Sequence, residues 1–595
     1  MGRAAPRRAA PPQAAPRRAA PPQPFDAQVA VVGAGPVGMT LAGRLAQHGV
    51  SVLVLEQEPR HAGEGSKALC MQRETLEIWS RLGVGEAVAR RGVQWNLGRT
   101  YFRGRELFQT RLPAREGDHF PPFVNISQTE VEELLLKRLG KLPQVDLRWG
   151  HRVAGLAQDG DGVTVRCEIG SETVSLRVAH LVGTDGAHST VRHLLGMGFP
   201  GHSHRDLFLI CDIRARLAFP HERRFFFDPP WNPGRQVLIH PQPDDTWRID
   251  WQVPSETDVD AERASGGLDR RIRAVIGQST PYELAWVTAY RFHQRVVGRF
   301  RVGRVLLAGD AAHLFSPFGA RGLNSGVADA ENLAWKLPLV LDGSAPDRLL
   351  ESYHLERRAA ALENQARTDA TMRFMVPRGP LRRAARNAIL RGSLHIRRLR
   401  RLVNSGRLAE PFVYVDSPII TPAARDRRAA RDRRTARDRR MLAPGDVAPD
   451  ARCTIAGSTA DSAAGSAAGS TAGSAGGSAA GSAGRRVARL RDLFGDRFVA
   501  LLLIAGPEAA AAAAIRASRL AWPAPCQVAV VGASGPLKGV TVLLDTKGEL
   551  RRSYGAAGSC AFLIRPDGHL AAIQPLASGE QVDALPALQA HAIGG

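Results

Sequence analysis

The sequence predicts an α/β protein in which a parallel βαβ-type domain is interrupted by a mostly antiparallel sheet and followed by a smaller α/β domain. Two apolar runs, residues 29–32 and 305–308, each end in a glycine-rich turn that leads into a helical pattern. Short aromatic-rich segments occupy residues 198–297 between them. Strand and helix patterns return after residue 497. These three observations indicate the fold class.

The first folded segment begins near Phe25 and contains a glycine-rich turn. Gly33, Gly35 and Gly38 follow the first strand with the spacing GxGxxG, and Glu56 ends the second strand 23 residues after the first glycine. The first glycine permits a tight turn, the second lets a pyrophosphate approach the backbone, and the third lets the helix pack on the strand. The acidic residue can accept ribose hydroxyls. The segment therefore predicts a Rossmann-type dinucleotide site.

A second strand–turn–helix unit covers residues 301–337. Asp310 follows the apolar run, a Pro/Gly-rich turn extends from Pro317 to Gly322, and a helical pattern begins near Asn324. A carboxylate at the carboxyl end of a strand can accept sugar hydroxyls, and helix N-terminal amides stabilise negative charge. The unit suits a polar anionic cofactor, although by itself it is equally typical of an ordinary βα unit.

The segment between the first turn and the aromatic strands predicts two helices, over residues 63–83 and 124–139, and a hairpin of strands over residues 145–182. Four positions on or next to these elements could face a nucleotide. They are Arg73 near the start of the first helix, Gln128 at the second helix, Val153 at a strand edge and Asp185 after the last strand. A solvated arginine and core residues would produce the same pattern.

Residues 198–297 read as short strands rich in aromatic residues, which pack well on half-buried sheets. The same residues could cover a flat ligand, and the sequence does not separate the two readings. Residues 376–420 predict an arginine-rich helical segment. Residues 441–595 predict a thioredoxin-like domain that carries an Ala/Gly/Ser-rich insert over 456–484. This domain contains no CxxC pair, so a dithiol redox role is not expected.

The net charge of +23 is partly confined to two segments that do not read as folded. Residues 1–24 form a proline/arginine arm, and residues 421–440 form a charged linker of repeated ARDRR units. Neither interleaves aromatics with its arginines, so no nucleic-acid partner is expected. No apolar run is long enough to span a membrane, and the N-terminus lacks the apolar core of a secretory signal, so a cytoplasmic protein is expected.

The six cysteines have no disulfide-framework or metal-ligand spacing, so no metal site and free buried thiols are expected.

Three motifs, GAGPVG with Glu56, GTDGAHSTVR and LLAGDAAHLFSPFGARGLNSG, occur in this order. In this combination the chain resembles the class A flavin-dependent aromatic hydroxylases. It is most similar to the branch of phenol hydroxylase and 3-(3-hydroxyphenyl)propionate hydroxylase, which carries a thioredoxin-like C-terminal domain. The resemblance covers roughly residues 25–420 and, more weakly, 441–595. It implies an FAD-binding domain over 25–197 and 298–375 and a substrate-binding sheet domain over 198–297. One departure is Gly-Ala-Arg-Gly at 319–322, where many relatives have Gly-Gly-Gln-Gly.

The resemblance implies FAD with its pyrophosphate on the three glycines of the first turn and its ribose on Glu56. It assigns Arg73 and Gln128 to the diphosphate and ribityl region, Asp185 to a shared FAD/NADPH motif, and Asp310 to ribityl or ribose hydroxyls. The flavin ring would meet Pro317 and the amides of Gly322, Leu323 and Asn324. A helix N-terminus at this place would also stabilise anionic reduced flavin.

The resemblance further implies an NADPH- or NADH-driven monooxygenase that uses molecular oxygen and hydroxylates a small phenolic or aromatic substrate through a C4a-hydroperoxyflavin. It allows a homodimer. The base that removes the phenol proton stays open among His240, Tyr290 and His293, and a substrate carboxylate could meet Arg214, Arg216 or Arg248. Two alternatives also stay open: an FAD-dependent dehydrogenase or reductase without oxygen insertion, and a non-catalytic flavin- or nucleic-acid-binding protein.

Overall fold

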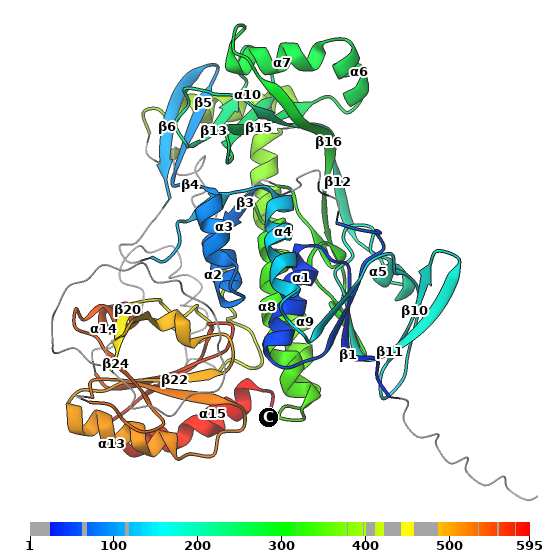
Figure 1. Cartoon of the computed structure of the whole chain (residues 1–595). Coiled ribbons are helices and arrows are strands. Elements are labelled where there is room, and N and C mark those ends of the chain that lie inside the picture. The colour runs from blue at the N-terminus through cyan, green and yellow to red at the C-terminus, as the bar shows by residue number, and fades with distance from the viewer. Residues whose placement is uncertain are drawn as a thin grey trace, which may run out of the picture.

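A computed structural model of the chain describes residues 24–61, 63, 68–112, 118–317, 319–377, 379–396, 398–399, 411–421, 442–456, 486–533, 535–555, 558–577 and 579–595. The predicted N-terminal arm, charged linker and Ala/Gly/Ser-rich insert lie outside the described residues, apart from single residues at their edges. Figure 1 shows a central body of helices and parallel strands, with an antiparallel sheet above it and a C-terminal sheet at one side.

The central body is built on an eight-stranded, mostly parallel sheet. Its strands run in the order β17–β18–β11–β1–β2–β8, and the antiparallel strands β10 and β9 continue from β11. Strand β18 follows the aromatic-rich segment in sequence, yet it pairs in parallel with β11, which precedes that segment. The strands are β1 (Ala27–Val32), β2 (Val52–Leu55), β8 (Val145–Arg148), β9 (Arg152–Gln158), β10 (Val163–Ile169), β11 (Glu172–Gly183), β17 (Arg301–Val302) and β18 (Val305–Leu307).

Long helices pack beside this sheet and share one apolar core with it. They are α1 (Pro36–Gln47), α4 (Gln128–Leu139), α8 (Gly322–Leu341) and α9 (Leu349–Met375). Three shorter helices, α2 (Arg73–Arg81), α3 (Gly85–Arg91) and α5 (Thr190–Leu194), and the turn η1 (Gly309–Ala311) complete the body. Helices α1 and α8 start at the two glycine-rich turns and pack on each other, so the two turns face the same region.

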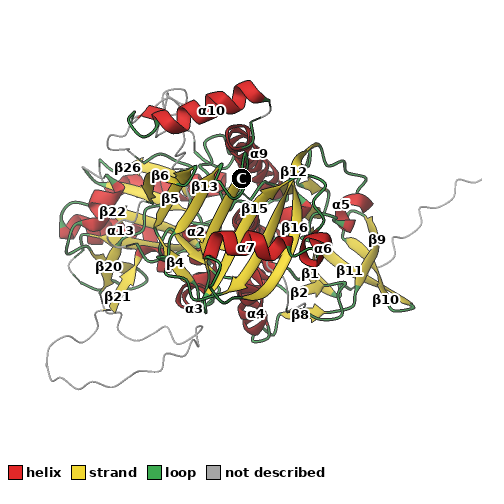
Figure 2. Ribbon diagram, turned by 90° about the horizontal axis from the view of Figure 1, so that it is seen from above, coloured by secondary structure: helices red, strands yellow, loops and turns green. Residues whose placement is uncertain are grey.

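A second sheet of eight strands, nearly all antiparallel, covers one end of the body (Figure 2). Its order is β19–β16–β12–β15–β14–β13–β5–β6. The strands are β5 (Leu97–Phe102), β6 (Arg105–Arg111), β12 (Gly201–Arg214), β13 (Arg223–Phe227), β14 (Gln236–Pro241), β15 (Thr246–Val253), β16 (Glu283–Val296) and β19 (His313–Leu314). Helices α6 (Val259–Ala264), α7 (Gly267–Ile276) and α10 (Pro380–Gly392) accompany it. The sheet therefore recruits β5, β6 and β19 from outside residues 198–297.

A small sheet joins the body to the antiparallel sheet. Strands β3 (Cys70–Gln72), β7 (Phe123–Asn125) and β4 (Val93–Trp95) run in the order β3–β7–β4. The two helices predicted from residues 63 and 124 begin later, at Arg73 and Gln128. In both cases the preceding residues pair as strands β3 and β7, and these backbone hydrogen bonds compete with the helix.

The C-terminal residues form a third layered unit with a seven-stranded sheet in the order β21–β20–β24–β23–β22–β25–β26. The strands are β20 (Arg452–Ile455), β21 (Arg486–Arg489), β22 (Phe498–Leu503), β23 (Cys526–Val531), β24 (Thr541–Leu544), β25 (Cys560–Ile564) and β26 (Leu570–Pro575). The helices are η3 (Leu490–Leu493), α13 (Pro507–Ser518), α14 (Glu549–Tyr554), η4 (Gly579–Ala584) and α15 (Leu585–Ala592). Trp335 of α8 and Phe498 of β22 meet edge to face in an apolar cluster that docks this unit on the body.

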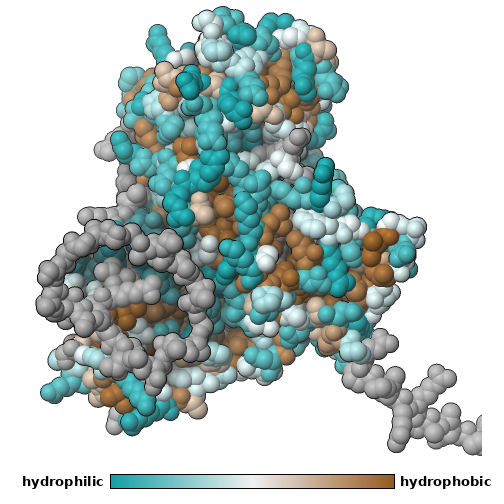
Figure 3. Space-filling view, in the orientation of Figure 1, coloured by the Kyte–Doolittle hydropathy of each residue, from teal (hydrophilic) through white to brown (hydrophobic). Residues whose placement is uncertain are grey.

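The face of the molecule in Figure 3 is mostly hydrophilic, with apolar residues in separate patches. Among the described residues, no helix has both the length and the apolar character that crossing a membrane requires. The six cysteines all fall within the described residues and are free thiols.

Candidate active site

The first glycine-rich turn has the backbone conformation that its sequence predicts. Gly33 adopts φ +102°, and a Cβ atom at this residue would lie 2.8 Å from the carbonyl oxygen of Thr184. A Cβ atom at Gly38 would lie 2.1 Å from the carbonyl oxygen of Gly33. Around Gly35, in contrast, no atom lies within 4 Å of the Cβ position. The turn is therefore closed on its protein side and open to a ligand at Gly35.

Two hydrogen bonds hold the Glu56 side chain beside this turn. Its carboxylate accepts hydrogen bonds from the backbone amides of Ala34 (2.7 Å) and Glu58 (3.1 Å). These two bonds orient the carboxylate at the carboxyl end of β2, next to the start of α1. A carboxylate oxygen accepts more than one hydrogen bond, so both oxygens keep capacity for sugar hydroxyls.

The second turn is held from behind by a buried ion-pair group centred on Asp329. Its carboxylate accepts hydrogen bonds from the Gly309 amide (3.0 Å) and the Arg357 Nε (2.6 Å), and it lies 2.7 Å from the His313 Nε2. Burial works against ionisation of Asp329, but the charges of His313 and Arg357 outweigh it and hold the pKa of the carboxyl below its ordinary value. This group fixes the backbone just before Asp310.

Asn324 ties the first turn of α8 to the small sheet. Its Oδ1 accepts hydrogen bonds from the Gln72 amide (2.9 Å) and the Thr75 hydroxyl (2.7 Å). Its Nδ2 donates to the carbonyl oxygens of Cys70 (2.9 Å) and Ala320 (2.6 Å). The Asn324 side chain therefore has a structural role. The backbone amide of Asn324 belongs to the N-terminus of α8, which lines the cavity.

One cavity of about 720 Å³ connects the two turns with the antiparallel sheet. Twelve of the sixteen predicted site residues line it: Gly33, Gly35, Glu56, Gln128, Val153, Asp185, His240, Asp310, Pro317, Gly322, Leu323 and Asn324. Both Gly35 and Gly322 leave the Cβ position open, so a ligand can approach the backbone at both turns. A cavity that is lined by a carboxylate, a glycine-rich turn and a helix N-terminus fits FAD.

Two of the lining side chains also have structural partners. The Asp185 carboxylate accepts hydrogen bonds from the Ser189 hydroxyl (2.6 Å) and the Val191 amide (3.0 Å), and burial raises its pKa. The Gln128 Oε1 accepts from the Ala68 amide (3.1 Å). Asp185 therefore supports the start of helix α5, whose N-cap is Ser189, while it lines the cavity.

Four predicted residues do not line the cavity. Gly38 packs behind the first turn, as its predicted structural task requires. Arg73 pairs with Asp118 (2.8 Å) and donates to the carbonyl oxygen of Phe120 (2.8 Å). Its role at the diphosphate stays a prediction. Two other basic residues, Arg60 and His61, do line the cavity, although neither stands out in the sequence.

Tyr290 and His293 lie on β16, outside the cavity lining. The His293 ring lies 2.7 Å from the Ser203 hydroxyl, and burial together with neighbouring arginines lowers its pKa. Tyr290 packs in the apolar cluster that contains Phe292, which does line the cavity. His240 is the residue of these three that reaches the cavity, and burial lowers its pKa well below the ordinary value.

The antiparallel sheet supplies the wall opposite the turns. Side chains from five strands, β12 to β16, line the cavity, and on β12, β14 and β15 they occupy alternate positions, as the two-residue period of a strand requires. The apolar ones are Phe208, Ile210, Leu238 and Phe292, and the polar ones are Arg223, His240, Arg248 and Asp250. The wall is thus a flat apolar surface that carries a small group of ionisable side chains.

Within this group Arg248 has an acidic partner, whereas one oxygen of Asp250 has no hydrogen-bond partner among the described residues. Asp212 accepts two hydrogen bonds from Arg248, at 2.8 and 2.7 Å. The Asp250 Oδ1 is buried and has no hydrogen-bond partner among the described residues, and burial raises the pKa of this carboxyl to about 7. Arg214 and Arg216 are exposed and pair with Glu283 and Asp245. Of the three arginines considered for a substrate carboxylate, only Arg248 reaches the cavity.

Asp250 and Arg223 are not among the site residues predicted from the sequence. In the segment TWRIDWQV, Arg248 and Asp250 alternate with Trp247, Ile249 and Trp251. Such alternation usually places the charged residues in solvent. Here both faces of the strand are covered, one by α7 and one by the cavity. An Asp and an Arg on one strand face, next to His240 on the neighbouring strand, was the available signal.

Comparisons with known proteins agree with this site. Residues 26–368 match the family model described as FAD binding domain. A 3-(3-hydroxy-phenyl)propionate/3-hydroxycinnamic acid hydroxylase of Mycobacterium sp. (strain JLS) is 31% identical over 406 residues, 67% of this chain and 69% of the relative. A rifampicin monooxygenase of Streptomyces venezuelae is 36% identical over 351 residues, 58% of this chain and 71% of the relative.

A solved structure has a similar fold over most of the chain. The flavin-dependent monooxygenase PieE, in complex with FAD and substrate, superposes with a TM-score of 0.74 at 23% identity and covers 96% of this chain and 100% of its own. The sequence relatives identify the family, and this similarity extends the shared fold into the C-terminal unit. The family predicted from the three motifs is confirmed: the chain belongs to the FAD-dependent aromatic hydroxylases, the class A flavin monooxygenases.

Proposed function

We propose that this FAD-dependent hydroxylase acts on a planar phenolic compound that lies against the sheet wall of the cavity, with NADPH or NADH as reductant and molecular oxygen as co-substrate. The observation that carries the proposal is the single cavity that joins the glycine-rich turn, the α8 N-terminus and the apolar wall. Relatives are named for substrates as different as 3-(3-hydroxy-phenyl)propionate and rifampicin. The proposal is therefore a substrate class, with the phenol as its common element.

The cavity lining supports a definite placement of FAD. Its pyrophosphate would meet the open backbone at Gly35, its ribose the Glu56 carboxylate, and its ring the amides at the start of α8. Bound there, FAD supplies the oxygen activation and the transfer of a hydroxyl group to the aromatic ring. The chain's own residues bind and orient the cofactor, exclude water behind the sheet wall, and stabilise negative charge at the helix N-terminus.

The ionisable group on the wall supports a proton acceptor for the phenol. Asp250 is poised near neutral pH, and a general base is most effective when its pKa lies near the working pH. Its unpartnered oxygen can accept the proton of a phenol hydroxyl directly. His240, which burial keeps neutral, lies on the adjacent strand directly opposite Arg248 and can hydrogen-bond the same ligand. We assign the base role to Asp250 and an orienting role to His240.

The reductant would bind transiently, since the sequence has no second GxGxxG turn after a strand. The C-terminal unit would be thioredoxin-like, as predicted. The order β23–β22–β25–β26 supports this, with β22 and β23 parallel and joined through α13, and with β25 and β26 as an antiparallel hairpin before α15. A homodimer stays a prediction, which light scattering of the purified chain would test.

The experiment is a screen of aromatic compounds against the FAD-loaded chain. Phenolic compounds that fit should accelerate the bleaching of the flavin absorbance by NADPH, and in ¹⁸O₂ the product should gain one labelled oxygen atom. Matched methoxy compounds, which cannot lose a phenol proton, should fit the wall but give little product. If NADPH is consumed with peroxide as the only oxygen product for every compound, the enzyme is a reductase or oxidase and the proposal is wrong.

A further inference from the structure

A second group of side chains, outside the cavity lining, has the composition of a metal site. His202 and His204 lie near the start of β12, and Asp369 lies on α9. One potential ligand atom from each of the three lies within 4.8 Å of the others. Two imidazoles and a carboxylate are a common donor set for transition-metal ions in proteins.

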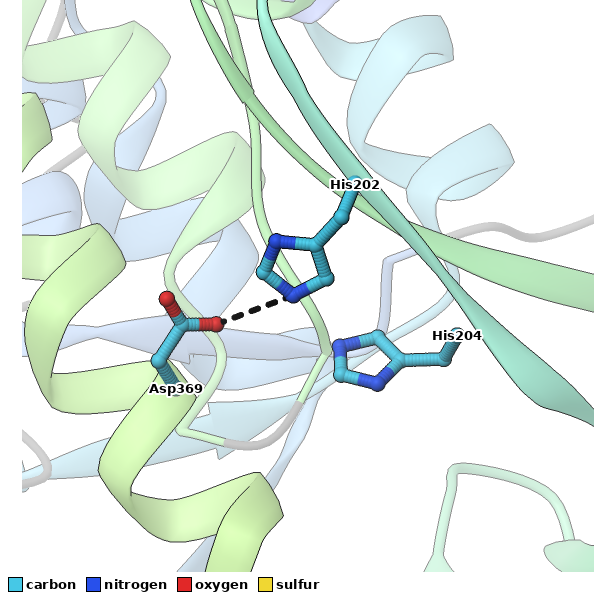
Figure 4. Close-up of side chains that lie close together, drawn as sticks. All are labelled: His202, His204 and Asp369. Atoms are coloured by element: carbon cyan, nitrogen blue, oxygen red, sulfur yellow. Dashed lines mark ion pairs between the residues drawn. The ribbon is translucent and has the colours of Figure 1, made fainter.

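The three side chains point toward one another. The rings of His202 and His204 lie edge to face, with their centroids 5.2 Å apart, at a place where the register of β12 is irregular. Figure 4 shows a nitrogen of each ring directed toward the Asp369 carboxylate across the gap between strand and helix. The His202 Nε2 lies 3.4 Å from the Asp369 Oδ1, which is long for a hydrogen bond. Ligands at about 2.0–2.1 Å from a tetrahedral zinc ion are separated by about 3.4 Å.

An independent observation comes from the neighbouring strand. Gln294 of β16 lies directly opposite His202 in the strand register and is fully buried. Neither its Oε1 nor its Nε2 has a hydrogen-bond partner among the described residues. Directly opposite residues in an antiparallel pair project to the same face, so Gln294 stands on the face of the sheet that carries His202. An amide in this place can hydrogen-bond a metal-bound water or the second nitrogen of an imidazole.

We propose that His202, His204 and Asp369 bind one divalent transition-metal ion, for which zinc is the fitting probe. The fourth position of a tetrahedral site would hold a water within reach of Gln294. Imidazole nitrogens favour zinc and its transition-metal neighbours over magnesium and calcium, which prefer all-oxygen sites. The ion connects the start of β12 to α9. It therefore links the sheet that forms the cavity wall to the helix that packs on α8.

The test is equilibrium dialysis of the untagged, FAD-loaded chain against zinc chloride after removal of metals with a chelator. We expect one zinc ion per chain, and at least tenfold weaker binding in His202→Ala, His204→Ala and Asp369→Asn. Cobalt(II) in place of zinc should give the intense visible absorption of a four-coordinate ion, which the variants should lack. Gln294→Leu should bind zinc more weakly than the wild type, by less than the ligand variants.

The matched control is His395→Ala, which removes an exposed histidine elsewhere and should leave zinc binding unchanged. Each variant should keep the flavin absorbance of the folded enzyme. If His204→Ala does not, His204→Gln tests the same ligand with a bulkier side chain. Zinc should raise the melting temperature of the wild type and leave that of Asp369→Asn unchanged. The proposal is overturned if the wild type binds no zinc, or if it and the ligand variants bind zinc equally.

Discussion

At the scale of single residues, the proton acceptor decides what the cavity can do. Asp250 has a pKa raised by burial to about 7, so its ionised and protonated forms coexist at neutral pH. We expect Asp250→Asn to lower kcat on a phenolic substrate by about 100-fold or more, because an amide cannot take the phenol proton. In the wild type, kcat should rise with pH through about 7, and this rise should be absent in the variant.

The measurement is a pH series of initial rates on the FAD-loaded enzyme, with hydroxylated product as the readout. Asp245→Asn is the control, since Asp245 is exposed at the turn between β14 and β15 and pairs with the exposed Arg216. It should keep the wild-type rate and pH profile. An Asp250→Asn enzyme with the wild-type profile would rule out Asp250 as the base.

The same carboxyl makes stability depend on pH. The pKa of Asp250 is about 7 in the folded chain, whereas an unfolded aspartate titrates near 3.9. The folded state therefore holds one more proton between these values, and the free energy of unfolding falls as pH rises through this window. Asp250→Asn cannot ionise, so its melting temperature should increase relative to the wild type between pH 5 and pH 8. Thermal melts at several pH values check this, and a constant difference would contradict it.

At the scale of elements, the start of α8 depends on one side chain. Asn324 makes four hydrogen bonds: three join this helix to β3 and α2, and the fourth goes to Ala320 in the turn before the helix. Asn324→Ala leaves buried backbone groups without partners, and we expect a loss of about 1–3 kcal/mol in the free energy of unfolding. FAD should also bind more weakly, because the helix N-terminus is no longer fixed. Denaturant unfolding and flavin fluorescence on dilution measure the two effects.

The graded control for Asn324 is Thr75→Val. It keeps the side-chain shape and removes one of the four hydrogen bonds, so its effects on unfolding and on FAD affinity should be smaller than those of Asn324→Ala. If the two variants lose stability equally while FAD affinity stays at the wild-type value in both, the anchoring of α8 does not position the cofactor.

The elements around the two turns were predictable because their signals are local. The glycine spacing, Glu56 and the Asp310 turn lie within single βα units, where residue types and spacing determine the backbone. The sheet wall was not predictable in this way. On β16, Phe292 lines the cavity and the next residue, His293, does not. The pairing of β16 with β12 has register irregularities, so the sequence does not show which of these residues faces the cavity. Asp250 was not predictable as a cavity residue, because both faces of its strand are buried.

At the scale of the whole molecule, a buried polar network connects the C-terminal unit to the cofactor loop. Arg565 of the C-terminal unit donates two hydrogen bonds to Glu356 of α9, at 2.6 and 3.0 Å. Glu356 also accepts from Lys336 of α8 (2.8 Å), whose pKa burial lowers to about 8. The residue after Glu356 is Arg357, which holds Asp329 and through it the backbone before Asp310. Arg565 and Glu356 are 209 residues apart, a separation that no sequence pattern could bridge.

This network predicts that the C-terminal unit supports the active site through α9. Arg565→Met should leave Glu356 buried with Lys336 as its remaining cation, and we expect a loss of about 3–5 kcal/mol in the free energy of unfolding. The FAD affinity should fall as well, and peroxide should take a larger share of the consumed oxygen, because the loop before Asp310 is less firmly held. Glu356→Gln and the double variant complete a cycle whose coupling energy isolates the ion pair. If the single variants lose stability while FAD affinity and peroxide yield keep their wild-type values, the C-terminal unit is attached to the enzyme without acting on its site.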